Sequence, residues 1–252
     1  MKRPAPVVSS SLMVQRADGS VLATLPVDEH LSDQMKGLLS RESRWRFLHN
    51  LDNSASQSKM SIEIRVVPVE VETTRPCGEV IRTVRDRPPG PQFGKLDLSE
   101  CEYVALELKN NGSEEAYISI VDLQSNGTIA PLWPQPRHNV ADNHRPNDGQ
   151  WYRLPLPYIF EICEPLGPEI FKAIATTEPT DFGLVVDPVF TRGTPRKNEG
   201  NALRSPLGQL LRSLALGTRS GTASIDPSDW STASVGFDVV DTGLGHCQLN
   251  NN

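Results

Sequence analysis

One segment, residues 102–177, alternates short apolar runs with turn signals, and this pattern constrains the fold more than any other feature. Val104, Leu106 and Leu108 lie at every second position, which is the period of a strand. Asn-Gly pairs at 111–112 and 126–127 are strong hairpin signals. The segment therefore predicts a three-stranded meander over 104–108, 117–123 and 128–133. Three further strands are expected at 151–154, 158–163 and 169–176.

Regularly spaced short strands with turns between them are typical of a two-layer antiparallel β-sandwich. We therefore predict a mainly β fold with an N-terminal helix and a C-terminal amphipathic helix. Leu31, Met35 and Leu38 have helical spacing after a possible cap at Asp28. An Asp-Gly turn at 18–19 predicts a hairpin before that helix. A second apolar stripe over 203–216 begins close to Pro206, which favours a helix start.

The chain divides into five expected parts. These are a disordered N-terminus at 1–10, a strand–helix–strand linker or docking segment at 11–72, a Pro-rich exposed connection at 73–100, the β-sandwich domain at 101–240 that includes helix 203–216, and a polar tail at 241–252.

Composition argues against several functional classes. The formal net charge is −6, and the small arginine clusters form no extended basic face, which argues against nucleic-acid binding. No apolar run reaches the ~20 residues that a spanning helix needs, and residues 1–4 lack a signal-peptide core. We therefore expect a cytoplasmic protein without a membrane partner. Its cysteines, with no C-x-x-C pair, are expected to be reduced thiols: Cys77, Cys101, Cys163 and Cys247.

The two Asn-Gly pairs also fit the glycosylation sequon, as Asn111-Gly112-Ser113 and Asn126-Gly127-Thr128. We favour turns over glycans at both positions, because nothing in the sequence indicates secretion.

The polar loop at 134–149 is the best binding candidate, because a long loop on a rigid sheet usually has a function. Aromatic residues flank it and offer a ligand-facing platform, although strand aromatics more often belong to the core. Two histidines in the loop could ligate a metal, but their spacing matches no standard site, so we predict no metal or cofactor. The candidate binding residues are Trp133, His138, His144, Trp151 and Tyr152.

The sequence predicts no catalytic site. Cysteine proteases need a thiolate and a histidine base brought together, and no cysteine here follows a buried apolar strand in a suitable motif. His246 and Cys247 are adjacent, but neighbouring residues on a strand point to opposite faces. The serine-hydrolase elbow Gly-x-Ser-x-Gly is also absent.

Several segments resemble a domain of unknown function that is found C-terminal to caspase-like, metacaspase-type peptidase domains in bacteria and some fungi. The resemblance covers residues 103–187, with looser similarity at both ends, including RWRFL at 44–48. It is carried by LELKN at 106–110, YISIVDL at 117–123, NGTI at 126–129, PLWP at 131–134, GQWYRLP at 149–155 and FKAIATTEP at 171–179.

The resemblance implies a non-catalytic accessory, regulatory or recognition module of a caspase-like cysteine peptidase. Its partner would be a caspase-like catalytic domain in cis or in trans, and also a protein substrate or activator. The alternative is a free-standing carbohydrate- or protein-binding β-sandwich, since one architecture hosts many functions. An independent hydrolase that uses His138 or His144 is the least favoured hypothesis. An exposed apolar patch on residues 12–51 would favour the first hypothesis, and exposed aromatics on one sheet face the second.

Overall fold

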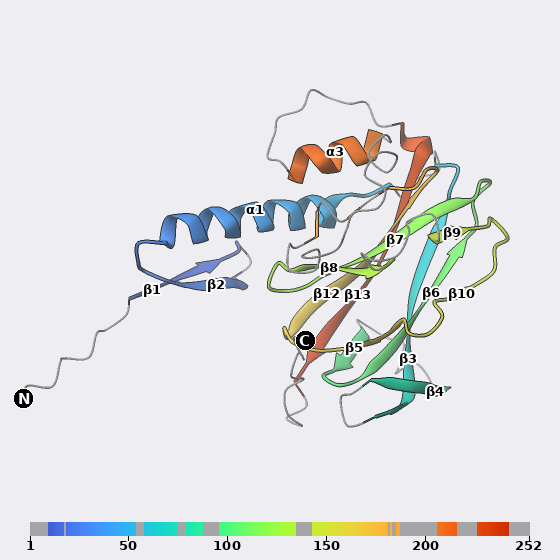
Figure 1. Ribbon diagram of the computed structural model, residues 1–252, viewed down its shortest axis with the longest axis horizontal. Helices are drawn as coiled ribbons and strands as arrows, with labels where there is room; N and C mark the ends of the chain where they lie inside the picture. The colour runs from blue at the N-terminus through green and yellow to red at the C-terminus, as the bar shows by residue number, and fades with distance from the viewer. Residues whose placement is uncertain are drawn as a thin grey trace, which may run out of the picture.

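The computed structural model describes residues 10–17, 19–53, 58–74, 79–87, 96–134, 143–180, 182, 185–186, 206–215 and 226–241. Within these residues the strands form three sheets (Figure 1). The two-stranded sheet pairs β1 (Ser11–Gln15) with β2 (Val21–Pro26). The five-stranded sheet contains β3 (Ile62–Thr73), β4 (Val80–Asp86), β6 (Tyr103–Asn110), β10 (Tyr152–Arg153) and β11 (Ile159–Glu161). The six-stranded sheet contains β5 (Leu96–Ser99), β7 (Ala116–Leu123), β8 (Ile129–Trp133), β9 (His144–Arg145), β12 (Gly167–Thr176) and β13 (Trp230–Val240).

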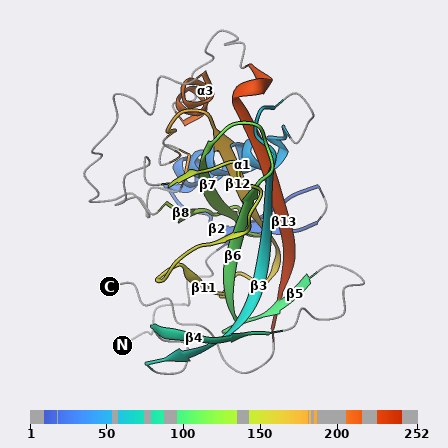
Figure 2. The same cartoon turned by 90° about the vertical axis from the view of Figure 1, so that its right-hand side faces the viewer.

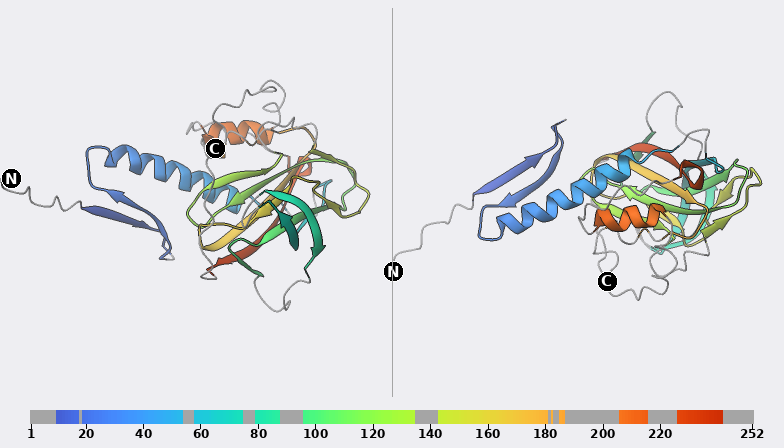
Figure 3. Two further views of the ribbon diagram at one scale, coloured as in Figure 1. Left: turned by 60° about the horizontal axis from the view of Figure 1, so that its bottom comes forward. Right: turned by 90° about the horizontal axis from the view of Figure 1, so that it is seen from above.

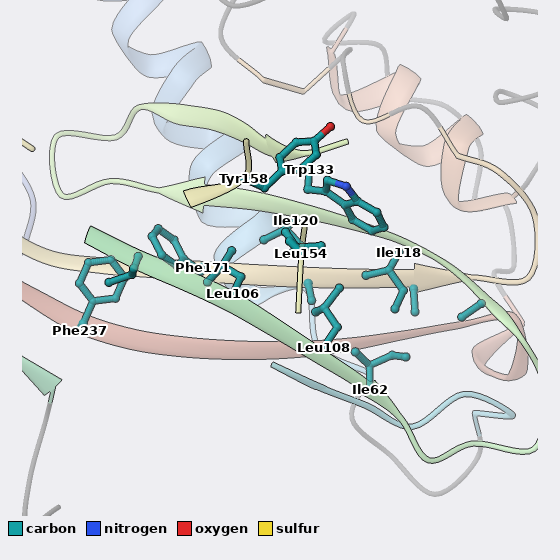
Figure 4. Close-up of a cluster of buried hydrophobic side chains, with 14 of the residues drawn as sticks. Ile62, Leu106, Leu108, Ile118, Ile120, Trp133, Leu154, Tyr158, Phe171 and Phe237 are labelled. Atoms are coloured by element: carbon teal, nitrogen blue, oxygen red, sulfur yellow. The ribbon is translucent and has the colours of Figure 1, made fainter. Parts of the chain in front are cut away.

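The five- and six-stranded sheets pack face to face, which confirms the predicted β-sandwich. Leu106 and Leu108 of β6 face Ile118 of β7, Phe171 of β12 and Phe237 of β13 in one buried cluster (Figure 4). The Phe171 and Phe237 rings meet edge to face with centroids 4.7 Å apart. Burying each such side chain contributes about 1.5–3 kcal/mol, so this interface is the principal source of stability.

Both predicted helices cover the other face of the six-stranded sheet and add a third layer (Figures 1 and 2). They are α1 (Leu31–Asn50) and α3 (Pro206–Ala215). Leu48 of α1 and Leu211 of α3 are fully buried in a cluster with Leu123 and Ile174 of the sheet. A short 3₁₀ helix, η4 (Pro227–Asp229), leads into β13. None of the described helices is long and apolar enough to cross a membrane.

The predicted meander is wrong in one strand. β7 and β8 form the expected hairpin, but β6 pairs antiparallel with β3 in the other sheet. Seven of the eight residues of β6 are buried, so both of its faces pack against protein. Its neighbour is therefore the long strand β3 rather than the next strand along the chain.

The expected Pro-rich connection at 73–100 contains two strands. β4 pairs with β3, and β5 pairs in parallel with β13. Arg82 and Arg85 of β4 form ion pairs with Glu72 and Glu70 of β3, with N–O distances of 2.7 and 2.6 Å. This strand is held by backbone pairing and surface charges, so its sequence lacks the apolar alternation of a half-buried strand. Residues outside the described part of the chain include 75–78 and 88–95 of that range, the termini at 1–9 and 242–252, and residues 203–205 and 216 of the predicted C-terminal helix.

Two glycines lie at positions where a residue with a side chain would be strained or would clash. Gly127 has a φ of +84° in the β7–β8 turn, a backbone conformation that favours glycine. Gly112, in the turn after β6, packs on the backbone that leads into β3. A Cβ at Gly112 would lie 2.5 Å from Met60 Cα and 2.7 Å from Ser61 N, and closer still to the Lys59 carbonyl oxygen. Asn126 and Gly127 therefore form the predicted tight turn. Asn111 and Gly112 lie instead in a bend whose backbone N–H groups bond to the segment before β3, from Asn111 to the Ser61 carbonyl and from Ser113 to the Lys59 carbonyl.

Candidate functional site

Four of the five predicted binding residues lie in the described part of the chain. Trp133 ends β8, His144 begins β9, Trp151 precedes β10, and Tyr152 begins β10. His138 lies outside the described residues. β9 and β10 lie at the end of the sandwich opposite the N-terminal hairpin (Figure 1).

Arg145 was not among the predicted binding residues, but it brings two of the predicted aromatics together. Its guanidinium carbon lies 4.6 Å from the ring centroid of Trp133 and 3.8 Å from that of Tyr152. Both distances are within the range of cation–π interactions. Trp133 is buried and belongs to the sandwich core, whereas Tyr152 is 37% exposed. The aromatic residues are therefore divided between core and site, and Arg145 links the two groups.

The donors of Arg145 are incompletely used. Nη1 donates a hydrogen bond of 2.5 Å to the His144 carbonyl oxygen, while the buried Nε has no hydrogen-bond partner among the described residues. Burial lowers the pKa of the Arg145 guanidinium, and the Tyr152 hydroxyl opposes that shift. An arginine remains protonated in proteins, so Arg145 is a half-buried positive charge.

Neighbouring arginines have carboxylate partners that Arg145 lacks among the described residues. Arg153 pairs with Asp86 at 2.7 Å and with Glu107 at 2.7 Å. Arg65 pairs with the same Glu107 at 2.5 Å and lies 4.1 Å from the ring centroid of Trp151. The Trp151 ring is thus covered by a cation that is already neutralised, whereas the cation beside Tyr152 is not.

A small cavity of about 110 Å³ opens beside these residues. Leu108 and Ile118 contribute apolar wall, and Trp151 and Tyr152 contribute aromatic wall. Its charged lining consists of Lys109 and Arg145 with one carboxylate, Asp148.

The loop from 146 to 150 that closes the cavity is held by its own hydrogen bonds. The Asp148 carboxylate accepts from the Gln150 N–H at 2.9 Å, and Gly149, at a φ of +65°, donates its N–H to the Asn110 carbonyl at 3.1 Å. The cavity therefore has a defined wall and a net positive lining.

His144 does not face this cavity. Its Nε2 lies 2.9 Å from the Glu115 carboxylate, and its ring packs against Tyr117 with centroids 5.0 Å apart. In the described ranges, no three His, Cys, Asp or Glu side chains are grouped so that they could hold a metal ion. The geometry places His144 in a surface contact with the Glu115 carboxylate and away from the cavity.

The expectation of reduced thiols is wrong for Cys101, which is disulfide-bonded, whereas the partly buried Cys163 is a thiol outside any disulfide. Spacing along the chain showed no C-x-x-C pair, and a disulfide between distant residues leaves no such local signal. Cys77, His246 and Cys247 lie outside the described residues.

A second candidate surface lies at the other end of the molecule. We define the N-terminal arm as β1, β2 and the first half of α1, residues 10–17 and 19–39; it extends beyond the sandwich (Figure 3, blue). The arm is attached through Arg16, whose Nε and Nη2 each lie 3.0 Å from Glu42 of α1, and whose Nη1 donates to the Ser125 carbonyl at 2.7 Å. Both charged side chains are nearly buried, with 10% and 8% exposure. This clamp connects the hairpin, the helix and the β7–β8 turn.

The arm leaves apolar side chains in solvent. Two of them, Met13 and Val21, lie on the hairpin face opposite Val14 and Ala23, as the pairing register shows. Among the large apolar side chains exposed on the described surface, five lie on the arm: Leu12, Met13, Val21, Val27 and Leu39. A two-stranded sheet is only marginally stable by itself, and exposed apolar groups of this kind mark interaction surfaces.

Comparison of the chain with protein-family models, with curated proteins and with solved structures finds no match.

Proposed function

We propose that this chain is a non-catalytic recognition module that docks, through its N-terminal arm, onto a caspase-like peptidase domain in the same polypeptide or in a partner. The observation that supports this proposal is the exposed apolar surface of the arm, which lies within residues 12–51, where such a domain was expected to dock. Met13 and Val27 are 58% and 53% exposed, respectively. The choice of a caspase-like partner rests on the sequence resemblance of residues 103–187.

The exposed charged residues of the arm indicate which kind of partner surface would be complementary to it. Glu29 and Asp33 are more than four-fifths exposed and follow Val27 along the chain. A complementary surface would be apolar at its centre with basic residues at its rim. The arm would keep its shape during docking, because the Arg16–Glu42 clamp fixes the hairpin against α1 in the free protein.

The alternative of a carbohydrate-binding sandwich has weaker support. Sugar platforms use open aromatic faces, but Trp133 is buried and Trp151 is covered by Arg65. Tyr152, at 37%, is the most exposed of these three aromatics. The apolar arm therefore favours docking to a protein.

A photo-crosslinking experiment tests the proposal. A benzophenone amino acid is placed at Val27 on the arm, or at Ile81 on β4, which has nearly the same exposure at 54% but lies on another part of the molecule. The full chain is expressed in its native cells, irradiated, and its crosslinks are identified by mass spectrometry. We expect Val27, and not Ile81, to crosslink to a polypeptide segment with a caspase-like catalytic domain.

The double substitution M13E/V27E provides a second, independent test. Both side chains are exposed, so the fold should survive within about 0.5 kcal/mol, and the crosslink from a probe at Leu39 should disappear. Crosslinks that lead to a second copy of this chain, to an unrelated polypeptide or to nothing would overturn the proposal.

A further inference from the structure

The cavity beside Arg145 has the properties of a ligand site whose occupant is not part of the described chain. Arg145 is a half-buried cation that is stacked between Trp133 and Tyr152, and none of the described carboxylates forms an ion pair with it. Buried or half-buried arginines are nearly always paired, because desolvating a charge is costly. The described residues thus hold a positive charge in a fixed position and provide no carboxylate that pairs with it.

Lys109 adds a second positive charge to the cavity lining. Its ammonium lies 3.7 Å from Glu63, close to the limit for an ion pair, and 5.7 Å from the centroid of Trp151. It also lines the cavity, together with Arg145. Asp148 opposes both cations from the same cavity, and its carboxylate is directed to the Gln150 N–H. Lys109 is shared with Glu63, so Arg145 is the cation of this lining that none of the described carboxylates pairs with. This charge favours an anionic group, and the flanking rings favour an apolar stem.

We propose that this cavity binds a carboxylate carried on a short apolar stem, with Arg145 as the principal anion contact. A guanidinium whose faces are stacked presents its edge donors to a ligand, and a carboxylate is the group that matches such donors. The cavity is smaller than the 150 Å³ known to accommodate benzene, so it accepts one small acid or one acidic side chain. The site is independent of the arm, at the opposite end of the sandwich.

Two sources of this chemistry are distinguished by the probes. One is sodium butyrate, with butyramide as the neutral isostere; the other is the peptide acetyl-Gly-Glu-Gly-amide, with its Gln counterpart. Each is titrated into the full chain at constant ionic strength, and the indole N–H of Trp151 and the backbone N–H groups of 149–153 are followed by NMR. We expect saturable shifts with the acid and none with the matched amide. Butyrate alone would indicate a free acid as ligand, and the peptide alone an acidic side chain.

Three variants test the assignment. Arg145→Gln should weaken carboxylate binding by at least about tenfold, as expected for the loss of a charged hydrogen bond. Asp148→Asn should strengthen it by about threefold, because the repulsive charge is removed while the acceptor for Gln150 stays. Arg82→Gln, on the exposed face of β4, is the matched control and should leave binding unchanged.

The two variants should change the carboxylate affinity in opposite directions. If Arg145→Gln perturbs the fold, the test still holds, because Asp148→Asn must increase the affinity. Equal binding of acid and amide, no saturable shift with either acid, or unchanged affinity in Asp148→Asn would each overturn the proposal.

Discussion

The clamp between Arg16 and Glu42 determines whether the N-terminal arm is a fixed surface or a loose extension, and Glu42→Gln tests it. The Glu42 carboxylate accepts three hydrogen bonds: two of 3.0 Å from Arg16 and one of 2.7 Å from Arg46. In the amide, one oxygen remains an acceptor, but the new NH₂ group faces a guanidinium donor. At least one charged hydrogen bond is then lost, at about 1.5–3 kcal/mol. Arg16 also remains nearly buried without its counter-charge, which brings the expected loss to about 3 kcal/mol.

This loss should be local. The arm contributes two buried leucines, Leu22 and Leu38, but neither belongs to the sandwich or helix-layer clusters. Hydrogen exchange of the β1 and β2 amides should therefore accelerate by about a hundredfold, since 1.4 kcal/mol is tenfold. The slowest amides of β6 and β12 should not change. Asp33→Asn is the matched control: it removes an exposed ion pair to Lys36 at 3.0 Å, which is worth at most about 1 kcal/mol.

The pH dependence follows from the same groups. Burial by itself raises the pKa of Glu42, but the hydrogen bonds from Arg16 and Arg46 outweigh it, so the folded-state pKa lies below the ordinary value of 4.5. The stabilisation is then fully present above the unfolded-state pKa, and it is lost as the pH falls through the lower folded-state value. Wild-type arm protection should fall below about pH 4.5, while Glu42→Gln should show no such step. Unchanged β1–β2 exchange in Glu42→Gln, or equal acceleration in β6, would refute the clamp as the local anchor of the arm.

Four further substitutions test the fold itself. Gly112→Ala should destabilise the protein by about 3 kcal/mol or more, because the methyl meets fixed backbone, whereas Gly37→Ala in the open part of α1 should stabilise it by about 0.5–1 kcal/mol; chemical denaturation gives both signs. Burial, and after it the charge of the neighbouring Asp122, raises the pKa of Glu169. The stability that protonated Glu169 contributes is therefore fully present below its ordinary pKa and is lost as the pH rises. Glu169→Gln should become more stable relative to wild type between about pH 5 and pH 9, and a difference in unfolding free energy that does not change with pH would contradict this. Leu48→Ala should cost about 2–5 kcal/mol in thermal unfolding.

The sequence predicted local features well, because those depend on neighbours along the chain. The Asn126–Gly127 turn, a helix over 206–215 within the predicted 203–216, and the strand predicted at 169–176, which is observed at 167–176, are all found in the structure. The strand that pairs with β6 could not be predicted from the sequence. Alternation identifies which side chains share a face, but it does not identify which strand lies alongside. Leu106 of β6 pairs with Val66, a residue forty positions earlier that no local pattern indicates.

The site was predicted in part for a similar reason. Trp133 and Tyr152 were recognised as aromatics around a long loop, but Arg145 resembled any solvated arginine in a polar segment. Its role depends on two rings that are separated along the chain and meet only in the fold. An arginine followed by Pro146, between flanking aromatics, was the available signal.

β7 connects the two candidate surfaces. Its first residues pair with β9, so that Ala116 lies opposite Arg145, and its far end leads to the turn whose Ser125 carbonyl binds Arg16. Between these points β7 pairs with β12 in a regular ladder, and with β8 in a ladder that has one register shift, between Ile120 and Val121. Transmission between the sites would require an element with two discrete arrangements. A single paired strand provides one arrangement, so the losses of stability in Arg145→Gln and Glu42→Gln should add within about 0.5 kcal/mol in the double variant. A larger coupling energy, measured by denaturant unfolding, would show that the arm and the cavity act as one unit.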